Sequence, residues 1–168
     1  MKKITSHGLT GKTYEVDPKD LIWRPSAYGI LIKDNKILVS KQWDGYDLPG
    51  GGVDLNETLE QGVIREVWEE TGLEGEVIDI IHSQTTFFTP DHSPKHKGEH
   101  WNCPLSYFLV KQTGGELSID NFDDEEQDYA EMAEWMPLEQ VSCSKFINSV
   151  DTPMVVNKDL KYIKLYEI

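Results

Sequence analysis

The pattern of apolar and polar residues along the chain predicts several short strands. Runs rich in β-branched and other apolar residues occupy residues 27–33, 36–41, 76–81 and 106–111, and residues 135–136 could close another strand. Between the first two runs lies Asp34-Asn35, a pair that favours turns, so these runs are expected to form a β-hairpin. A short helix is expected after the last run, near residues 138–144.

One longer segment, residues 57–71, predicts a helix. It contains no proline and ends before Gly72, where a helix commonly has its C-cap glycine. Leu59, Val63 and Val67 recur at a spacing of four residues, which gives the helix an apolar stripe that should pack on a sheet. Strands alternating with helices predict an α/β fold.

Length and composition favour one globular domain that spans residues 1–168. Hydrophobic residues make up 38% of the chain and charged residues 27%, which is ordinary for a folded domain. No secretory leader and no long apolar run is evident, so we expect a cytoplasmic protein that does not enter a membrane. Cys103 and Cys143 are too few for a disulfide framework.

The formal net charge of −14 narrows the class of partner. This charge repels nucleic-acid backbones and anionic lipid, and no basic patch offsets it, so neither is expected to bind. An anionic small molecule would need divalent cations or a few well-placed basic side chains to bring it in.

Three glutamates of the predicted helix are candidates for a metal site. Glu66, Glu69 and Glu70 fall at i, i+3 and i+4, which places their carboxylates on one arc of the helix. Like charges at this spacing destabilise a helix, and a bound cation would remove that penalty. Oxygen ligands suit Mg²⁺, Mn²⁺ or Ca²⁺, and Mg²⁺ commonly binds substrate phosphates as well. A solvated acidic face is the alternative interpretation of the same residues.

The residues around these glutamates form a longer pattern. Gly51 is followed after five residues by Glu57, and after seven more by the run Arg-Glu-Val-Trp-Glu-Glu-Thr-Gly-Leu at 65–73. This arrangement resembles the signature of the Nudix hydrolases, written G-x5-E-x7-R-E-U-x-E-E-x-G-U with U aliphatic. Every defined position of the signature is met within residues 51–73.

The resemblance implies a Nudix-type α/β/α sandwich with a mixed central sheet. It also implies a metal-dependent hydrolase that cleaves a pyrophosphate bond in a nucleoside diphosphate joined to another group. Nucleoside triphosphates and nucleotide-sugars such as ADP-ribose are equally favoured as the small-molecule substrate. The alternative is a non-catalytic Nudix-type module that binds a nucleotide and regulates another process.

The resemblance further assigns roles to individual residues. The ligands of Mg²⁺ or Mn²⁺ would be a backbone carbonyl and three carboxylates: Gly50, Glu66, Glu69 and Glu70. Glu66 would also be the general base for water, as in some members of the family. Arg65 would orient the glutamates by charge-assisted hydrogen bonds, and Glu57 would either bind the metal or bond Arg65.

Weaker signals lie outside the signature. Many members of the family draw one more carboxylate from a loop just before a late strand, so the resemblance implies that the acidic run before Trp135 could supply one here. The candidates are Glu125, Glu126, Asp128 and Glu131. The histidines of His92–His100 recur every four residues, but Pro94 and Gly98 interrupt any helix. A mobile loop that covers the substrate, in which Lys95, Lys97 or a histidine could meet phosphate, is therefore favoured over a zinc site. A plain surface loop is the alternative.

Two further expectations concern aromatic residues and assembly. Phe87, Phe88 and Trp101 could stack on a base, although aromatic residues beside strands more often belong to the core. The first twenty or so residues precede the predicted hairpin and could pair across a homodimer.

Overall fold

The structure is a computed structural model that describes residues 2–42, 45–122, 127, 130–147 and 155–156. Across these residues the helices are α1 (Leu59–Thr71) and two 3₁₀ helices, η1 (Pro18–Asp20) and η2 (Leu138–Cys143). The strands are β1 (Ile4–Gly8), β2 (Thr13–Val16), β3 (Ile22–Trp23), β4 (Ser26–Ile30), β5 (Ile32–Lys33), β6 (Lys36–Gln42), β7 (Gly45–Asp47), β8 (Gly50–Gly52), β9 (Leu73–Thr89), β10 (Trp101–Gly115) and β11 (Ala130–Pro137).

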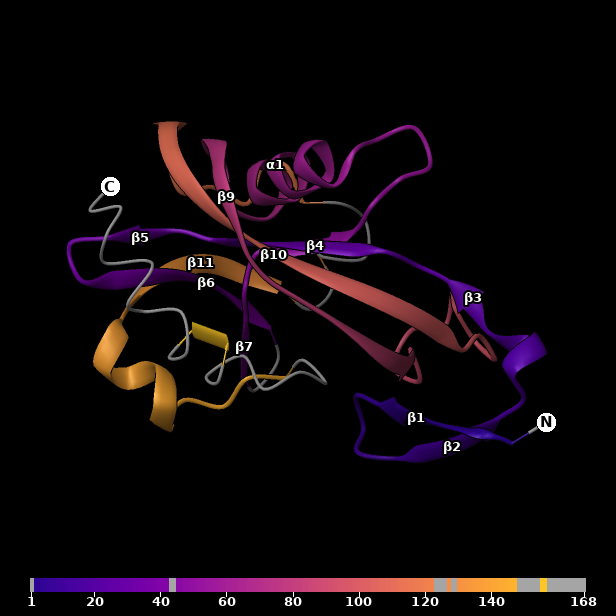
Figure 1. Ribbon diagram of the computed structural model, residues 1–168. Helices are drawn as coiled ribbons and strands as arrows, with labels where there is room; N and C mark the ends of the chain where they lie inside the picture. The colour runs from indigo at the N-terminus through magenta and orange to yellow at the C-terminus, as the bar shows by residue number, and fades with distance from the viewer. Residues whose placement is uncertain (1, 43–44, 123–126, 128–129, 148–154, 157–168) are drawn as a thin grey trace.

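The strands form two hydrogen-bonded sheets (Figure 1). The larger sheet has the order β2-β1-β9-β10-β4-β8, with β3 also paired to β10. The smaller sheet has the order β11-β6-β5, with β7 paired to β6. Because β4 runs parallel to β10 while β9 runs antiparallel to it, the larger sheet is mixed, as predicted.

The predicted hairpin is present, and it joins the two sheets. β5 and β6 pair antiparallel around Asp34 and Asn35, whose φ angles of 50° and 59° lie in the left-handed region. Asn and Asp tolerate this region, and its twist suits a tight hairpin. The first predicted run is divided, because Ser26–Ile30 belongs to the larger sheet and Ile32–Lys33 to the smaller one.

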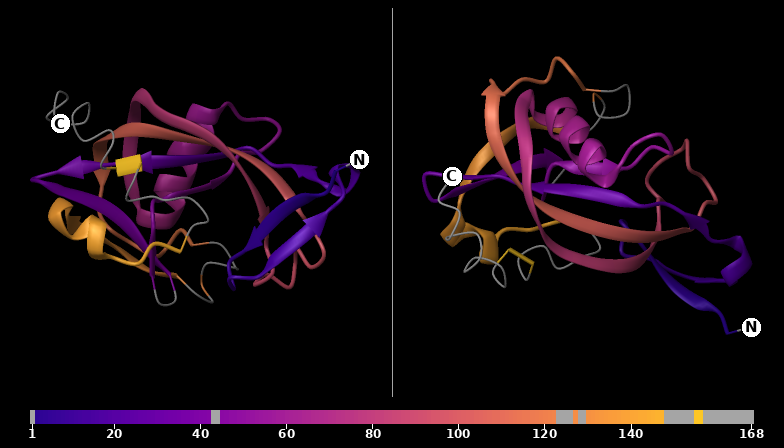
Figure 2. Two further views of the ribbon diagram at one scale, coloured as in Figure 1. Left: turned by 60° about the horizontal axis from the view of Figure 1, so that its bottom comes forward. Right: turned by 45° about the horizontal axis from the view of Figure 1, so that its top comes forward.

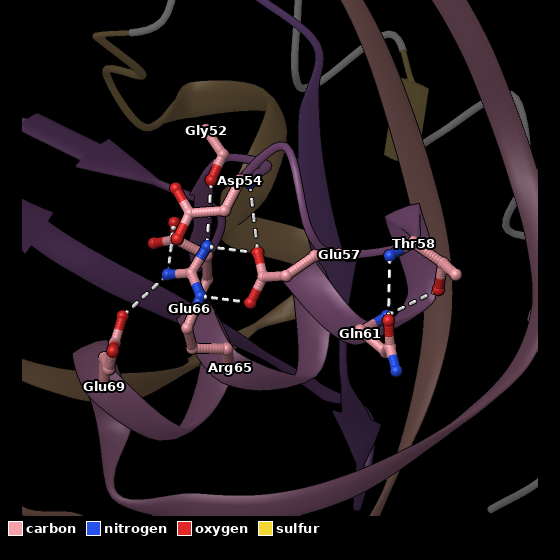
Figure 3. A network of polar contacts seen from close by, with 8 residues as sticks. All are labelled: Gly52, Asp54, Glu57, Thr58, Gln61, Arg65, Glu66 and Glu69. Atoms are coloured by element: carbon pink, nitrogen blue, oxygen red, sulfur yellow. Dashed lines mark hydrogen bonds and ion pairs between the residues drawn. The ribbon is translucent and has the colours of Figure 1, made fainter.

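The predicted helix begins slightly later than expected. Its N-cap is Thr58, whose hydroxyl accepts the Gln61 N–H at 3.2 Å while the Gln61 side chain accepts the Thr58 N–H at 2.9 Å. This reciprocal capping box, visible in Figure 3, leaves Glu57 just outside the helix. The helix ends where predicted, at Gly72, which adopts the left-handed conformation with φ 75°.

Alternating side chains place the core in two layers, one on each side of the sheets. On one side, Val63 and Val67 of α1 are fully buried against Ala27, Leu31, Leu38, Phe108 and Val110. On the other side, Val141 of η2 packs with Ile30, Ile37, Tyr107, Leu109, Val155 and Val156. Each fully buried valine or leucine contributes about 1.5–3 kcal/mol. The sheets therefore lie between α1 and η2 (Figure 2), and η2 occupies the position predicted for a short helix.

Two features of the larger sheet were not predicted. β9 and β10 extend well beyond 76–81 and 106–111, because they pair with each other along nearly their whole length through several bulges. The β1-β2 hairpin pairs with β9 of its own chain, at the end of the molecule away from η2 (Figure 2). Among the described residues, no helix is long and apolar enough to cross a membrane.

Candidate active site

The residues of the signature meet where β8 lies beside α1. Each glycine of β8 contacts a different charged side chain of the helix: Gly50 contacts Glu70, Gly51 contacts Glu66 and Gly52 contacts Arg65. A strand without side chains lets the helix bring these groups directly against its backbone. The site is therefore assembled from two elements that are close neighbours in the sequence.

Arg65 connects most of the site through its guanidinium group (Figure 3). Its Nε and Nη2 donate to the two carboxylate oxygens of Glu57 at 2.7 and 3.0 Å. Its Nη1 donates to Glu66 at 2.9 Å and to Glu69 at 2.8 Å, and Nη2 also donates to the Gly52 carbonyl at 2.9 Å. The hydrogen bonds that Arg65 donates to Glu57, together with the surrounding negative charge, raise the pKa of Arg65, so the guanidinium stays charged.

Glu57 is a partner of Arg65 in this structure. Both of its carboxylate oxygens accept hydrogen bonds from the guanidinium, and Oε2 also accepts the Asp54 N–H at 3.1 Å. These bonds hold the pKa of Glu57 below its ordinary value. Of the two roles that the resemblance allowed for Glu57, the geometry favours the bond to Arg65.

Glu66 lies against the backbone of Gly51. A Cβ atom at position 51 would lie 2.8 Å from Oε2 and 2.9 Å from Oε1 of Glu66, so only glycine leaves room for this carboxylate. The residue is 9% exposed. A carboxylate held this far from water requires compensating donors, and Arg65 supplies one of them.

Glu70 is held by a residue that sequence reasoning missed. The Ser40 hydroxyl of β6 donates to Glu70 Oε2 at 2.6 Å, and the Gly50 N–H reaches the same oxygen at 3.3 Å. Ser40 and Glu70 are both buried. The only available signal was a small polar residue directly after the apolar run Ile37–Val39, which does not indicate its partner.

The donor set fits a hard divalent cation, although the carboxylates are engaged by protein groups. Among the described residues, no three Asp, Glu, His or Cys side chains form a ready-made metal site. Instead, Arg65 bridges Glu66 and Glu69 while Ser40 holds Glu70. The carboxylates lie on successive turns of one helix beside a glycine strand. Their oxygen atoms are the kind of ligand that Mg²⁺ or Mn²⁺ prefers.

The other candidate carboxylates lie elsewhere or outside the described residues. Three of them lie outside the described residues: Glu125, Glu126 and Asp128. Glu131 is exposed on β11 and accepts a hydrogen bond from Lys41 at 2.6 Å. This ion pair raises the pKa of Lys41 and uses the Glu131 carboxylate in a surface contact.

The three histidines of the connection between β9 and β10 face different partners. The ring of His92 lies beside Phe88, His96 contacts Glu99 at 3.1 Å and His100 contacts Thr89 at 2.7 Å. Within the described part of the chain they form no shared metal site.

Two of the three aromatic residues beside this connection, Phe88 and Trp101, are part of the core. Trp101 is only 6% exposed, and Phe88 packs against the same core cluster. Both residues face the layer opposite α1, so their rings contribute to packing there.

The fold and the site together define an α/β protein in which a glycine strand, an arginine and three helical glutamates come together in one place. A family model described as NUDIX domain matches residues 23–155. The chain therefore belongs to the Nudix family.

Several relatives share part of the sequence. An RNA pyrophosphohydrolase of Sphingopyxis alaskensis is 33% identical over 122 residues, which cover 62% of this chain and 73% of the relative. An ADP-ribose pyrophosphatase of Methanocaldococcus jannaschii is 36% identical over 94 residues, which cover 53% of this chain and 51% of the relative. A MutT-like protein of Streptomyces ambofaciens is 41% identical over 66 residues, covering 36% of this chain and 43% of the relative. The chain thus spans about half or less of the length of the last two.

Solved structures share the fold. A NUDIX hydrolase from Nitrosomonas europaea superimposes with a TM-score of 0.62 at 15% identity, over 85% of this chain and 91% of that one. A MutT protein from Methanosarcina mazei Go1 gives a TM-score of 0.57 at 19% identity, over 85% and 97% of the two chains. At these identities the likeness concerns the fold, and it agrees with the predicted Nudix architecture.

Proposed function

We propose that this protein is a metal-dependent pyrophosphatase that hydrolyses a phosphoanhydride bond in a nucleoside diphosphate joined to another group. The observation that carries the proposal is the Glu66 carboxylate. It lies against the backbone of Gly51, is tied to Arg65 and has two further glutamates on the same helix. A purely structural acidic face has no need of a buried carboxylate at a glycine strand.

Individual residues have the following roles in this proposal. The metal would be held by the three carboxylates together with a backbone carbonyl: Glu66, Glu69, Glu70 and Gly50. When bound, Mg²⁺ or Mn²⁺ neutralises phosphate charge and lowers the pKa of a bound water. Glu66 is the general base that accepts a proton from the attacking water, and Arg65 fixes the direction of its carboxylate by the 2.9 Å hydrogen bond.

The same site and the names of the relatives support the substrate class that we propose. Two of them are named for activity on ADP-ribose and on RNA, and both names describe pyrophosphate chemistry. Nucleotide-sugars and nucleoside triphosphates are the substrates that we favour. The net charge of −14 disfavours a long polyanion such as RNA.

The test is a hydrolysis assay with a matched pair of variants. Wild type, Glu66→Gln and Glu60→Gln are incubated with Mg²⁺ or Mn²⁺ and a panel of nucleoside triphosphates, nucleotide-sugars, dinucleoside polyphosphates and a 5′-triphosphorylated oligonucleotide. Glu60 is an exposed residue on the same helix, so its variant controls for the loss of one charge. We expect turnover by wild type and Glu60→Gln and a loss of several orders of magnitude in Glu66→Gln.

Two other results would contradict the proposal. Equal turnover in wild type and Glu66→Gln would place the chemistry elsewhere. If no panel compound is cleaved but one of them raises the melting temperature of the protein, the non-catalytic nucleotide-binding module would be favoured.

Removal of the metal gives a second test. We expect a chelator to abolish turnover and leave the melting temperature nearly unchanged, because the two apolar core layers do not depend on the site. A large drop in melting temperature on chelation would show instead that the metal is structural.

We also propose that residues 1–168 form a single domain. The segment before residue 23, where the family match begins, includes β1 and β2, and β1 pairs with β9 inside the matched region. Limited proteolysis tests this, since a separate N-terminal unit would be released intact.

A further inference from the structure

Arg24 lies at the edge of the glycine strand, on the side away from α1. Its guanidinium sits over the ring of Trp101, 4.2 Å from the centroid, and Trp101 belongs to the core layer opposite the helix. A Cβ atom at Gly52 would lie 2.6 Å from Nη2 of Arg24. Arg24 therefore touches the same short strand that holds the glutamates on its other side.

Arg24 and Arg65 differ in their charged partners. Arg65 bonds three carboxylates, whereas Arg24 forms no ion pair among the residues that the structure describes. Its Nη1 donates to the Ser26 hydroxyl at 3.3 Å, which is a neutral partner. In a chain with 30 acidic and 16 basic residues, an arginine without a carboxylate partner is unexpected, because most nearby charge is negative.

The position of Arg24 is fixed from two directions. Its backbone N–H donates to the Asn102 carbonyl at 3.0 Å, which attaches it to the start of β10. The Trp101 ring beneath it is held by a hydrogen bond from Nε1 to Glu99 Oε2 at 2.7 Å. A guanidinium supported on an aromatic face loses little freedom when it binds a ligand, and Arg24 is only half-buried.

Strand geometry places Arg24 and Glu66 on the two faces of β8. Successive residues of a strand face opposite sides, and here Gly51 faces Glu66 while Gly52 faces Arg24. A diphosphate lying across this strand edge would have the carboxylates and their cation on one side and a guanidinium on the other.

We propose that Arg24 binds a phosphate oxygen of the substrate diphosphate and so supplies the basic group that an acidic protein needs to hold a polyanion. This inference rests on the proposed function and identifies which residue recognises the diphosphate. Arginine suits the task because its planar fork can donate two parallel hydrogen bonds to one phosphate.

The experiment measures binding of α,β-methylene adenosine diphosphate, which cannot be hydrolysed at the bridging position, by calorimetry with Mg²⁺ present. Arg24→Gln should weaken binding on the order of tenfold or more, and Arg24→Lys should fall between it and wild type, because it keeps the charge without the fork. Lys33→Gln is the matched control, since Lys33 is an exposed cation of β5 in the other sheet. It should bind the analogue as wild type does.

The outcomes separate this inference from the proposed function. Wild-type affinity in Arg24→Gln would overturn the role of Arg24 and leave the hydrolysis assay unaffected. Equal weakening in Arg24→Gln and Lys33→Gln would also overturn it, because the effect would then be that of net charge. If Arg24→Gln unfolds, Arg24→Lys decides: unchanged affinity in that variant overturns the two-bond contact. A wild type that neither binds the analogue nor cleaves any panel member would overturn the proposed function itself.

Discussion

Replacing Arg65 by lysine should destabilise the protein measurably, although the charge is retained. The guanidinium donates to Glu57, Glu66, Glu69 and the Gly52 carbonyl at 2.7 to 3.0 Å. An ammonium group has three donors around one nitrogen and cannot reach partners on several sides at once.

The size of the effect can be worked from these contacts. A hydrogen bond to a charged group contributes about 1.5–3 kcal/mol, and a lysine at this position would keep one or two of the five. Glu69 is 31% exposed on its side chain, so its bond is partly replaced by water, whereas Glu57 and Glu66 are only 15% and 12% exposed. Three or four lost bonds at about 1.5 kcal/mol each amount to roughly 5 kcal/mol, and water that reaches the Arg65 and Glu69 side chains, which are 27% and 31% exposed, recovers part of this. We therefore expect a net loss of about 3 kcal/mol, which for a chain of this length lowers the melting temperature by roughly 6–12 °C.

The assay is thermal unfolding followed by circular dichroism at neutral pH with a chelator present, so that bound metal does not contribute. Arg24→Lys is the matched control, because Arg24 forms no ion pair among the described residues and its one side-chain hydrogen bond goes to the neutral Ser26 hydroxyl. A lysine can keep a positive charge over the Trp101 ring, so the shift in melting temperature should be much smaller. Equal melting temperatures for wild type and Arg65→Lys would refute the reasoning, since they would show that the network adds nothing beyond one positive charge.

Three further substitutions test other parts of the site. Gly51→Ala places a methyl group 2.8 Å from Glu66 Oε2, and turnover should fall on the order of a hundredfold with little change in melting temperature; unchanged turnover would contradict the close contact. Ser40→Ala removes the 2.6 Å hydrogen bond to Glu70 and should weaken Mn²⁺ binding severalfold by electron paramagnetic resonance, while Ser40→Thr should restore it. The pKa of Glu57 is lowered from 4.5 by the adjacent guanidinium, so its ionised form contributes stability that is complete above that value and is lost as the pH falls through the lowered pKa. Glu57→Gln should therefore show a shallower acid dependence of unfolding than wild type, and an identical dependence would show that Glu57 contributes none of it.

The signature could be interpreted from the sequence because its parts are local. Arg65, Glu66, Glu69 and Glu70 lie on one helix, and helical periodicity alone determines that their side chains share a face. The stop at Gly72 is equally local, since it depends on one residue with a left-handed backbone.

The contributions of Ser40 and Arg24 could not be predicted in the same way. Ser40 reaches Glu70 across thirty positions of sequence. Arg24 lies near the glycine strand because β4 pairs with β8, and the pairing of β3 with β10 brings Trp101 beneath it. Such contacts depend on strand pairing, which no short pattern specifies. The full length of β9 was missed for a related reason, because residues 82–86 are polar and belong to the strand through their pairing with β10.

The attachment of the β1-β2 hairpin implies that stability is uneven along the chain. Two residue pairs join β1 to β9, at His7 with Phe88 and Gly8 with Thr89, whereas β10 is paired along most of its length on one side and by β4 on the other. Asp91 adds hydrogen bonds from Thr10 and Tyr14. A unit held by so few bonds can open without global unfolding, so its backbone amides should exchange with solvent deuterium faster than those of β10. Each opening would also break the hydrogen bonds to Asp91, which begins the connection that leads to Trp101. Local opening of the β1-β2 hairpin is therefore coupled to the position of the Trp101 ring beneath Arg24.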